Sequence, residues 1–245
     1  MKKLIIPALA TLAMAGSANA QGFANGGITL SYESFTFSGG LERFSDSGLG
    51  GFAIFELGSA FDVQIGASLM NIVYNSSNTY SDTNVNIHGI YNISPALRAG
   101  VVYSTSTQWE TNTDGITSYG VELQYDLGAF MIEAQAGATE VFNDDATFAS
   151  VRANYDFGVV GIDGIYSFLT VDSGSGSMLA LRANYEVAAL YNAELFGQVS
   201  FMSDSFGSPS ETYFEVGVTI PFGTGGKEPF SDPNNAIRAF HLYFD

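Results

Sequence analysis

The stretch that decides the fold is Tyr119-Gly120-Val121-Glu122-Leu123-Gln124-Tyr125-Asp126-Leu127. Apolar side chains occupy every odd position, and glycine or polar residues occupy every even one. Because successive side chains of a strand point to opposite faces, this period of two predicts a strand with one apolar and one polar face.

The same alternation recurs along the chain, with turn-like breaks between the segments. Each segment has 10 to 14 residues, near the roughly 9–11 that a tilted membrane strand needs, and no comparable window shows a helical period. The twelve predicted strands lie near 26–37, 48–57, 61–74, 83–92, 96–106, 115–127, 130–139, 147–157, 159–171, 177–187, 191–203 and 212–222.

The connections between these segments alternate between short turns and longer polar loops. Each short turn follows an aromatic residue, and these aromatics recur every 30 to 36 residues, which is the length of one up-and-down hairpin. Short turns on one rim and longer loops on the other are typical of outer-membrane barrels, whose short turns are periplasmic. The longer loops are predicted at 38–46, 75–82, 107–114, 140–145, 172–176 and 204–211. The recurring aromatics predict an interfacial girdle at the periplasmic rim, formed by Phe55, Tyr91, Tyr125, Tyr155 and Tyr185.

The placement of charge separates a membrane barrel from a soluble β-protein. The apolar face of the predicted strands carries no charged side chain, and every strand charge has the opposite parity. A soluble sandwich would fill its polar face with Lys and Glu, whereas here that face holds mainly Asn, Gln, Ser and Gly. We therefore predict an all-β fold, a closed antiparallel up-and-down transmembrane β-barrel of about 12 strands. A periplasmic β-domain is the alternative.

Charge and composition narrow the function classes. Residues 1–20 combine two lysines, an apolar run and the small-x-small site Ala18-Asn19-Ala20, which predicts a cleaved secretory signal peptide. The barrel then spans 21–223, and a C-terminal extension spans 224–245. Loss of Lys2 and Lys3 changes the formal charge from −17 to −19, which argues against nucleic-acid binding. The chain has no Cys, which removes disulfides and thiolate metal sites, and we predict no cofactor and no metal site.

Several motifs resemble porins and porin-like outer-membrane proteins of Gram-negative bacteria. They are turns such as Tyr125-Asp126-Leu127-Gly128, the acidic composition, and a closing strand that alternates and ends in an aromatic residue. The resemblance implies an outer-membrane location, contact with outer-membrane lipids and lipopolysaccharide, and passive diffusion of small solutes or ions. Two features differ from the trimeric general porins: no loop is long enough to fold into the pore, and the chain continues past the terminal aromatic. The closing strand looks like the family's signal for the outer-membrane assembly machinery, carried by Val216, Val218, Ile220 and Phe222.

The extension over 224–245 permits three interpretations. Gly225-Gly226 and Pro233-Asn234-Asn235 have the composition of a linker and a turn, and residues 240–244 alternate again. The segment could be a flexible periplasmic extension, a lumen plug formed by 240–244, or the true last strand. We favour the flexible extension, because a last strand that ends at Phe222 gives an even strand count with both ends periplasmic.

A belt of charged side chains is predicted inside the lumen. Its members lie about three positions from a short turn, so they should share one height, and basic and acidic members are neighbours along the wall. The belt could be a constriction whose field selects solutes, or an ion-pair network that stiffens the barrel, and both can hold together. In strand order the belt residues are His88, Arg98, Glu122, Glu133, Arg152, Asp163, Arg182 and Glu194.

Carboxylates outnumber arginines both in the strands and in the predicted outer loops, so a conducting pore should prefer cations. A non-conducting structural or adhesive barrel is an alternative. A lipid-modifying enzyme is a further one, but neither His88 nor His241 has a serine and an orienting acid beside it in the pattern. We predict no catalytic residues. The acidic loop residues expected at the outer mouth are Glu42, Asp46, Asp82, Glu110, Asp114, Glu140, Asp144, Asp145, Asp172, Asp204 and Glu211.

Overall fold

The computed structural model describes residues 22–36, 43–74, 78–108, 115–141, 144–172, 174–204, 211–223, 229–234 and 237. The predicted signal peptide lies outside these ranges, as do His241, the 240–244 segment, and the loop residues Glu42, Glu110 and Asp114.

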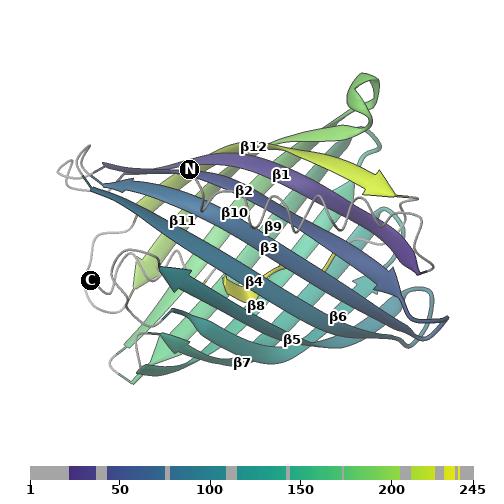
Figure 1. The fold of residues 1–245 in the computed structure, drawn as a ribbon, viewed down its shortest axis with the longest axis horizontal. Helices are drawn as coiled ribbons and strands as arrows, with labels where there is room; N and C mark the ends of the chain where they lie inside the picture. Colours follow the sequence, from purple (N-terminus) through teal and green to yellow (C-terminus); the bar gives the residue numbers. More distant parts are fainter. Residues whose placement is uncertain are drawn as a thin grey trace.

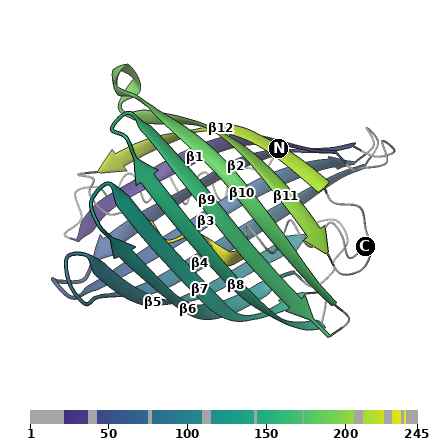
Figure 2. The ribbon, with the colours of Figure 1, turned by 180° about the vertical axis from the view of Figure 1, so that it is seen from behind.

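The described strands form one closed antiparallel barrel, and they run obliquely around it (Figures 1 and 2). Each strand pairs with the next along the chain, and β1 closes the ring by pairing with β12. No helix among the described residues is long and apolar enough to cross a membrane. The strands are β1 (Phe23–Thr36), β2 (Arg43–Glu56), β3 (Phe61–Tyr74), β4 (Asn78–Asn92), β5 (Leu97–Gln108), β6 (Thr117–Asp126), β7 (Phe130–Val141), β8 (Asp144–Asp156), β9 (Val160–Val171), β10 (Gly174–Val187), β11 (Ala193–Asp204) and β12 (Glu211–Gly223).

All twelve predicted strands are confirmed, but several extend further toward the long loops than expected. β2 and β4 each begin five residues earlier than predicted, at Arg43 and Asn78. Strand pairing needs only backbone hydrogen bonds, so a ladder can continue where the apolar alternation has stopped. Five of the predicted loop carboxylates lie at the ends of strands rather than in loops: Glu140, Asp144, Asp145, Asp204 and Glu211. The placement of Asp46 and Asp82 in outer loops is likewise wrong. They lie within β2 and β4, and both are buried.

The outer and inner faces of the barrel separate as the alternation predicts. Outward side chains at mid-strand are apolar and exposed, as at Val121 and Val216, which are 62% and 56% exposed. Lumen-facing neighbours such as Gln124 and Glu133 are buried. Of the predicted aromatic girdle, Tyr91, Tyr125, Tyr155 and Tyr185 are exposed, and Phe55 is half-buried against Phe23, with ring centroids 5.8 Å apart. Phe222 of the terminal strand also stacks on Phe23, with ring centroids 5.8 Å apart.

The repeated turn motif has a local physical basis. In the turn between β6 and β7, the Asp126 carboxylate accepts a hydrogen bond of 2.7 Å from the Gly128 amide, and Gly128 has φ 86°. The turn between β8 and β9 repeats this with Asp156 and Gly158, at 2.6 Å and φ 94°. The aspartate closes a tight turn whose left-handed position favours glycine, which explains the spacing Tyr-Asp-x-Gly.

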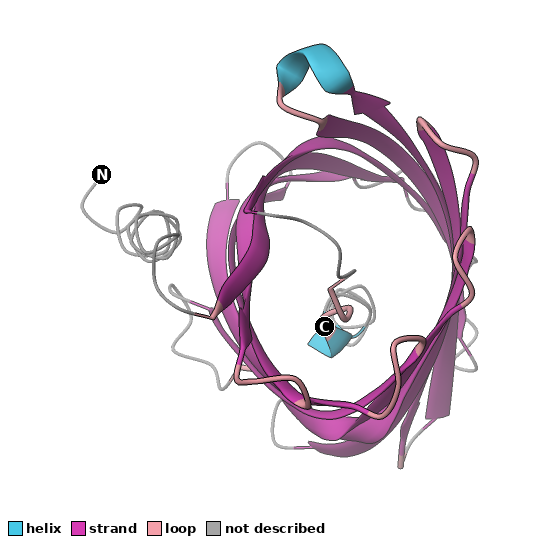
Figure 3. Ribbon diagram, turned by 90° about the vertical axis from the view of Figure 1, so that its right-hand side faces the viewer, coloured by secondary structure: helices cyan, strands magenta, loops and turns pink. Residues whose placement is uncertain are grey.

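The C-terminal segment lies inside the barrel, so the flexible extension favoured from the sequence is wrong for the described part. Figure 3 shows this part of the chain within the ring of strands. Phe230, Asn234 and Ile237 are 3%, 0% and 1% exposed. The third interpretation is wrong as well, because β12 already closes the sheet against β1.

Candidate functional site

The described tail residues follow the lumen from the short-turn rim toward the long-loop rim. Phe230 contacts Gln64, which is three positions above the start of β3. Ile237 packs near the opposite end of the barrel, beside Val141 at the last position of β7. The tail therefore runs along the barrel rather than across it.

Half of the predicted charge belt lies on β4 to β7, on the wall that the tail covers. His88 Nδ1 is 2.9 Å from Glu122 Oε2, and both side chains are fully buried. Arg98 donates a hydrogen bond to Gln124. Glu133 accepts a hydrogen bond of 2.9 Å from the Ser231 amide of the tail. On this wall the belt is a packed polar network that also holds the tail.

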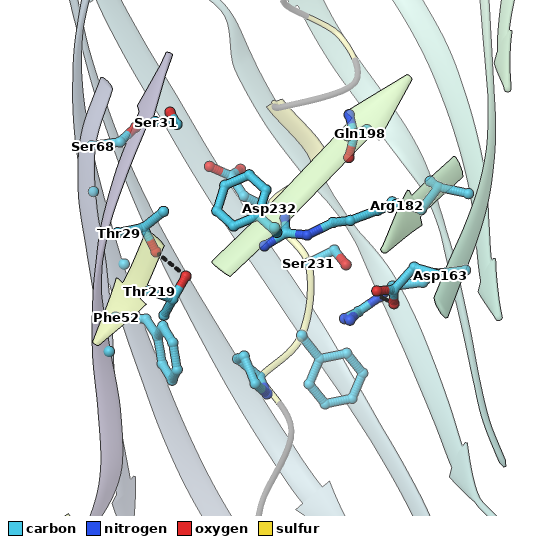
Figure 4. Close-up of a pocket in the computed structure, with 18 of the residues that line it drawn as sticks. Thr29, Ser31, Phe52, Ser68, Asp163, Arg182, Gln198, Thr219, Ser231 and Asp232 are labelled. Carbon is cyan, nitrogen blue, oxygen red and sulfur yellow. Dashed lines mark hydrogen bonds and ion pairs between the residues drawn. The ribbon is translucent and has the colours of Figure 1, made fainter. Parts of the chain in front are cut away.

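The other half of the belt borders a cavity of about 960 Å³ between the tail and the opposite wall. Arg152 Nε donates to Asp163 Oδ1 at 2.7 Å, and the Asp163 side chain is only 1% exposed. Arg182 extends into the cavity in Figure 4, its guanidinium carbon 3.6 Å from the centroid of the Phe196 ring. Glu194 departs from the predicted common height. It is exposed, and it lies directly across from Glu186 in the register of β10 and β11, next to the short-turn rim.

Strand register arranges the polar side chains of this wall in one row. Residues that face each other directly across neighbouring strands have side chains on the same face of the sheet. Three carboxylates are consecutive in the row, and Ser31 hydrogen-bonds to one of them, Glu215. The attraction between Glu215 and Arg182 joins the acidic part of the row to the basic part. From β2 through β1 and back to β8, the row is Asp46, Glu33, Glu215, Gln198, Arg182, Asp163 and Asn154.

An apolar layer lies in the lumen near the long-loop rim. It includes Ile237 of the tail, which packs with buried side chains from the wall. The sequence reasoning missed this layer, although the sequence carries a signal for it. Adjacent apolar pairs such as Phe168-Leu169 and Phe201-Met202 interrupt the alternation, and in these pairs Leu169 and Met202 are buried. The layer consists of Ile116, Val141, Ala146, Phe148, Leu169, Met178, Met202, Tyr213 and Ile237.

The site offers no arrangement for nucleophilic catalysis at His88. Its Nδ1 faces Glu122, and its Nε2 lies 3.2 Å from Asn86 Oδ1, so both ring nitrogens are engaged. Within the described residues, no group of three or more His, Asp or Glu side chains is placed to hold a metal ion. The arrangement can instead bind and orient charged or polar groups that enter the cavity.

No protein-family model matches the sequence, and no curated protein matches it. Solved structures do match the fold. The KdgM porin is similar with a TM-score of 0.57 at 12% identity, over 80% of this chain and 99% of that one. The NanC porin has a TM-score of 0.61 at 9% identity, over 79% and 98% of the two chains. An outer membrane channel from Pseudomonas putida F1 has a TM-score of 0.61 at 10% identity, over 82% and 96%. These likenesses show that the chain has the barrel fold of outer-membrane porins and channels, as the sequence resemblance implied.

Proposed function

We propose that the protein is an outer-membrane channel for the passive diffusion of small solutes or ions. The observation that carries the proposal is the polar, charge-lined cavity enclosed by a barrel whose outer surface is apolar. A closed barrel leaves no backbone group unpaired in lipid, so the fold suits a membrane, and the polar lining suits aqueous solutes. The porins and the channel with the same fold support the proposal by their stated functions.

The proposal includes the cellular setting. Residues 1–20 would direct export and be removed, and the terminal strand would be read by the outer-membrane assembly machinery. The exposed apolar belt would contact outer-membrane lipids, and the long-loop rim would meet lipopolysaccharide.

We further propose that the channel prefers cations. Among the described residues that line the cavity, the basic ones are Arg152 and Arg182, and carboxylates outnumber them. A confined lumen with an excess of one charge concentrates counter-ions and repels co-ions. The carboxylates of the lining are Glu33, Asp46, Asp82, Asp126, Asp156, Asp163, Glu194, Glu215 and Asp232.

Single-channel recording of the mature protein in a planar bilayer tests both proposals. We expect discrete current steps and, under a salt gradient, a reversal potential of the sign for cation preference. The preference should weaken as salt rises, because the Debye length falls from about 10 Å at 0.1 M to about 3 Å at 1 M. Glu33→Gln should reduce the preference and Arg152→Ala should strengthen it, whereas Tyr119→Phe on the apolar outer face of β6 serves as the control. Anion preference at low salt would contradict the charge assignment.

A non-conducting structural barrel is the second candidate. The observation that favours it is the filling of the lumen by the tail and by the apolar layer around Ile237. Absence of current steps from correctly folded protein would favour this candidate over the channel.

A further inference from the structure

The lumen wall holds the tail backbone with a complete set of hydrogen bonds at two consecutive residues. Gln64 accepts from the Phe230 amide at 2.9 Å and donates to the Phe230 carbonyl at 2.8 Å. Glu133 accepts from the Ser231 amide at 2.9 Å, and Gln135 donates to the Ser231 carbonyl at 2.6 Å. Every backbone donor and acceptor of this dipeptide is therefore satisfied by a wall side chain. Such pairing of main-chain groups is how proteins bind extended peptides.

The side chains of the tail also occupy fitted positions. The Phe230 ring stacks beside His88, with centroids 6.2 Å apart, and it lies under the Arg98 guanidinium, whose carbon is 5.1 Å from the ring centroid. A cation over an aromatic face is an attractive arrangement. Ile237, seven residues further along, is buried in the apolar layer.

Between these two anchors, polar side chains of the tail bind polar side chains of the wall. Asp232 accepts hydrogen bonds from Asn84 and, at 2.9 Å, from Ser104. Asn234 donates to Asn84 at 3.0 Å and accepts from Ser118 at 2.6 Å. Several of these wall residues are fully buried, so each would carry a desolvation cost if the tail were absent and water could not replace it.

We propose that the lumen holds a binding site for an extended peptide, formed by the β3–β7 wall and the apolar layer, that its resident ligand is the chain's own tail (229–234 and Ile237), and that this tail sets the conducting cross-section. The inference rests on the proposed channel function for its second part. While the tail is seated, solutes pass along the other wall, beside Arg182 and the carboxylate row. When the tail leaves, the part of the β3–β7 wall that it covers is added to the pathway.

The first experiment weakens the seating in the full-length chain. Gln64→Ala combined with Gln135→Ala removes three of the four backbone contacts at Phe230 and Ser231 and leaves the strand ladders in place. Thr105→Ala combined with Thr117→Ala is the matched control, because these two side chains bond each other and neither lines the cavity or contacts the tail. We expect at least about a twofold rise in single-channel conductance for the glutamine double variant and no change for the control. Equal conductance of the wild type and the glutamine double variant would overturn the restriction.

The second experiment tests the binding site without relying on conduction. A protease recognition sequence in place of residues 225–228 allows the tail to be cut after the barrel has folded and then washed away. A fluorescent peptide with the sequence of 229–237 should bind the cut barrel, as measured by anisotropy, and a peptide with Phe230→Ala and Ile237→Ala should bind at least about tenfold more weakly. Equal binding of the two peptides, or no binding of either, would overturn the peptide site.

The two experiments separate the two proposals. If the peptide binds but neither the intact nor the cut barrel conducts, the channel function and the restriction both fail and the peptide site stands. If the intact barrel is silent and the cut barrel conducts until the peptide is added, the tail closes the pore completely, which supports the restriction.

Discussion

Replacement of Asp163 by Asn should reveal how much the lumen ion pair contributes to the stability of the barrel. The Asp163 carboxylate is 1% exposed and accepts hydrogen bonds from Arg152 at 2.7 Å, Asn184 at 2.9 Å and Asn154 at 3.2 Å. It also lies directly across the strand pair from Arg182. Asn has nearly the same shape, but it carries no charge, and one of its two terminal groups is a donor that would face other donors.

The expected cost follows from these contacts. Breaking a buried ion pair by removing one partner costs about 3–5 kcal/mol, because the other charge is left uncompensated. The Arg152 side chain is 15% exposed, so water can recover part of the loss, and we expect about 2–4 kcal/mol for Asp163→Asn. Denaturant unfolding in detergent micelles, followed by circular dichroism, measures the change in unfolding free energy.

Two controls test whether the loss comes from the Arg152–Asp163 pair. Asp144→Asn, at the exposed end of β8, should change the unfolding free energy by no more than about 0.5 kcal/mol. In a double-mutant cycle, Arg152→Ala and Asp163→Asn should be strongly non-additive, because each removes the same interaction. An Asp163→Asn variant as stable as the wild type would refute the structural role of the pair and leave selectivity as its main function.

Two further perturbations test the topology and the packing of the wall. A cysteine introduced at Asp144 should react with an impermeant thiol reagent added to intact cells, and one at Gly158 should not; equal labelling would reverse or abolish the assignment of periplasmic turns. Gly217→Ala should destabilise the barrel by about 1–3 kcal/mol, because a Cβ there would lie 2.4 Å from the Phe196 ring and 2.5 Å from the Leu30 carbonyl. Gly197→Ala is the matched control, with no atom within 4 Å of the added Cβ, and comparable losses for both variants would argue against close packing at Gly217.

The architecture was predictable because the membrane imposes a simple rule on every strand. Lipid on one face and a polar lumen on the other produce a period of two that survives without any long-range information. The rule applies only within the apolar zone, so the prediction missed the parts of β2 and β4 that continue beyond it. Asp46 and Asp82 lie in these parts. Backbone pairing holds these extensions together, and backbone pairing leaves little trace in the side-chain pattern.

The division of the lumen could not be predicted in the same way. The pattern placed eight belt residues at one height on a uniform wall, because parity and distance from a turn are local quantities. Which of them lie under the tail depends on contacts such as Gln64 with Phe230, which join residues 166 positions apart. Gly225-Gly226 and Pro233 give the segment the composition of a linker, and this composition does not distinguish a free segment from one bound in the lumen. Composition alone therefore favoured the wrong interpretation of the tail.

The two walls of the lumen differ in how their carboxylates are engaged, and this links the proposed selectivity to the proposed restriction by the tail. On the β3–β7 wall, Asp82, Glu122 and Glu133 outnumber Arg98, but Glu122 lies against His88 and Glu133 accepts a hydrogen bond from the Ser231 amide. The opposite wall carries the consecutive carboxylates of the row. Removal of the tail would widen the pathway around the row, and mobile ions would screen its carboxylates across a larger aqueous section. Conductance and cation preference should consequently change in opposite directions when the tail is released. A released barrel that gained conductance and also became more selective for cations would show that the tail, rather than the carboxylate row, governs which ions pass.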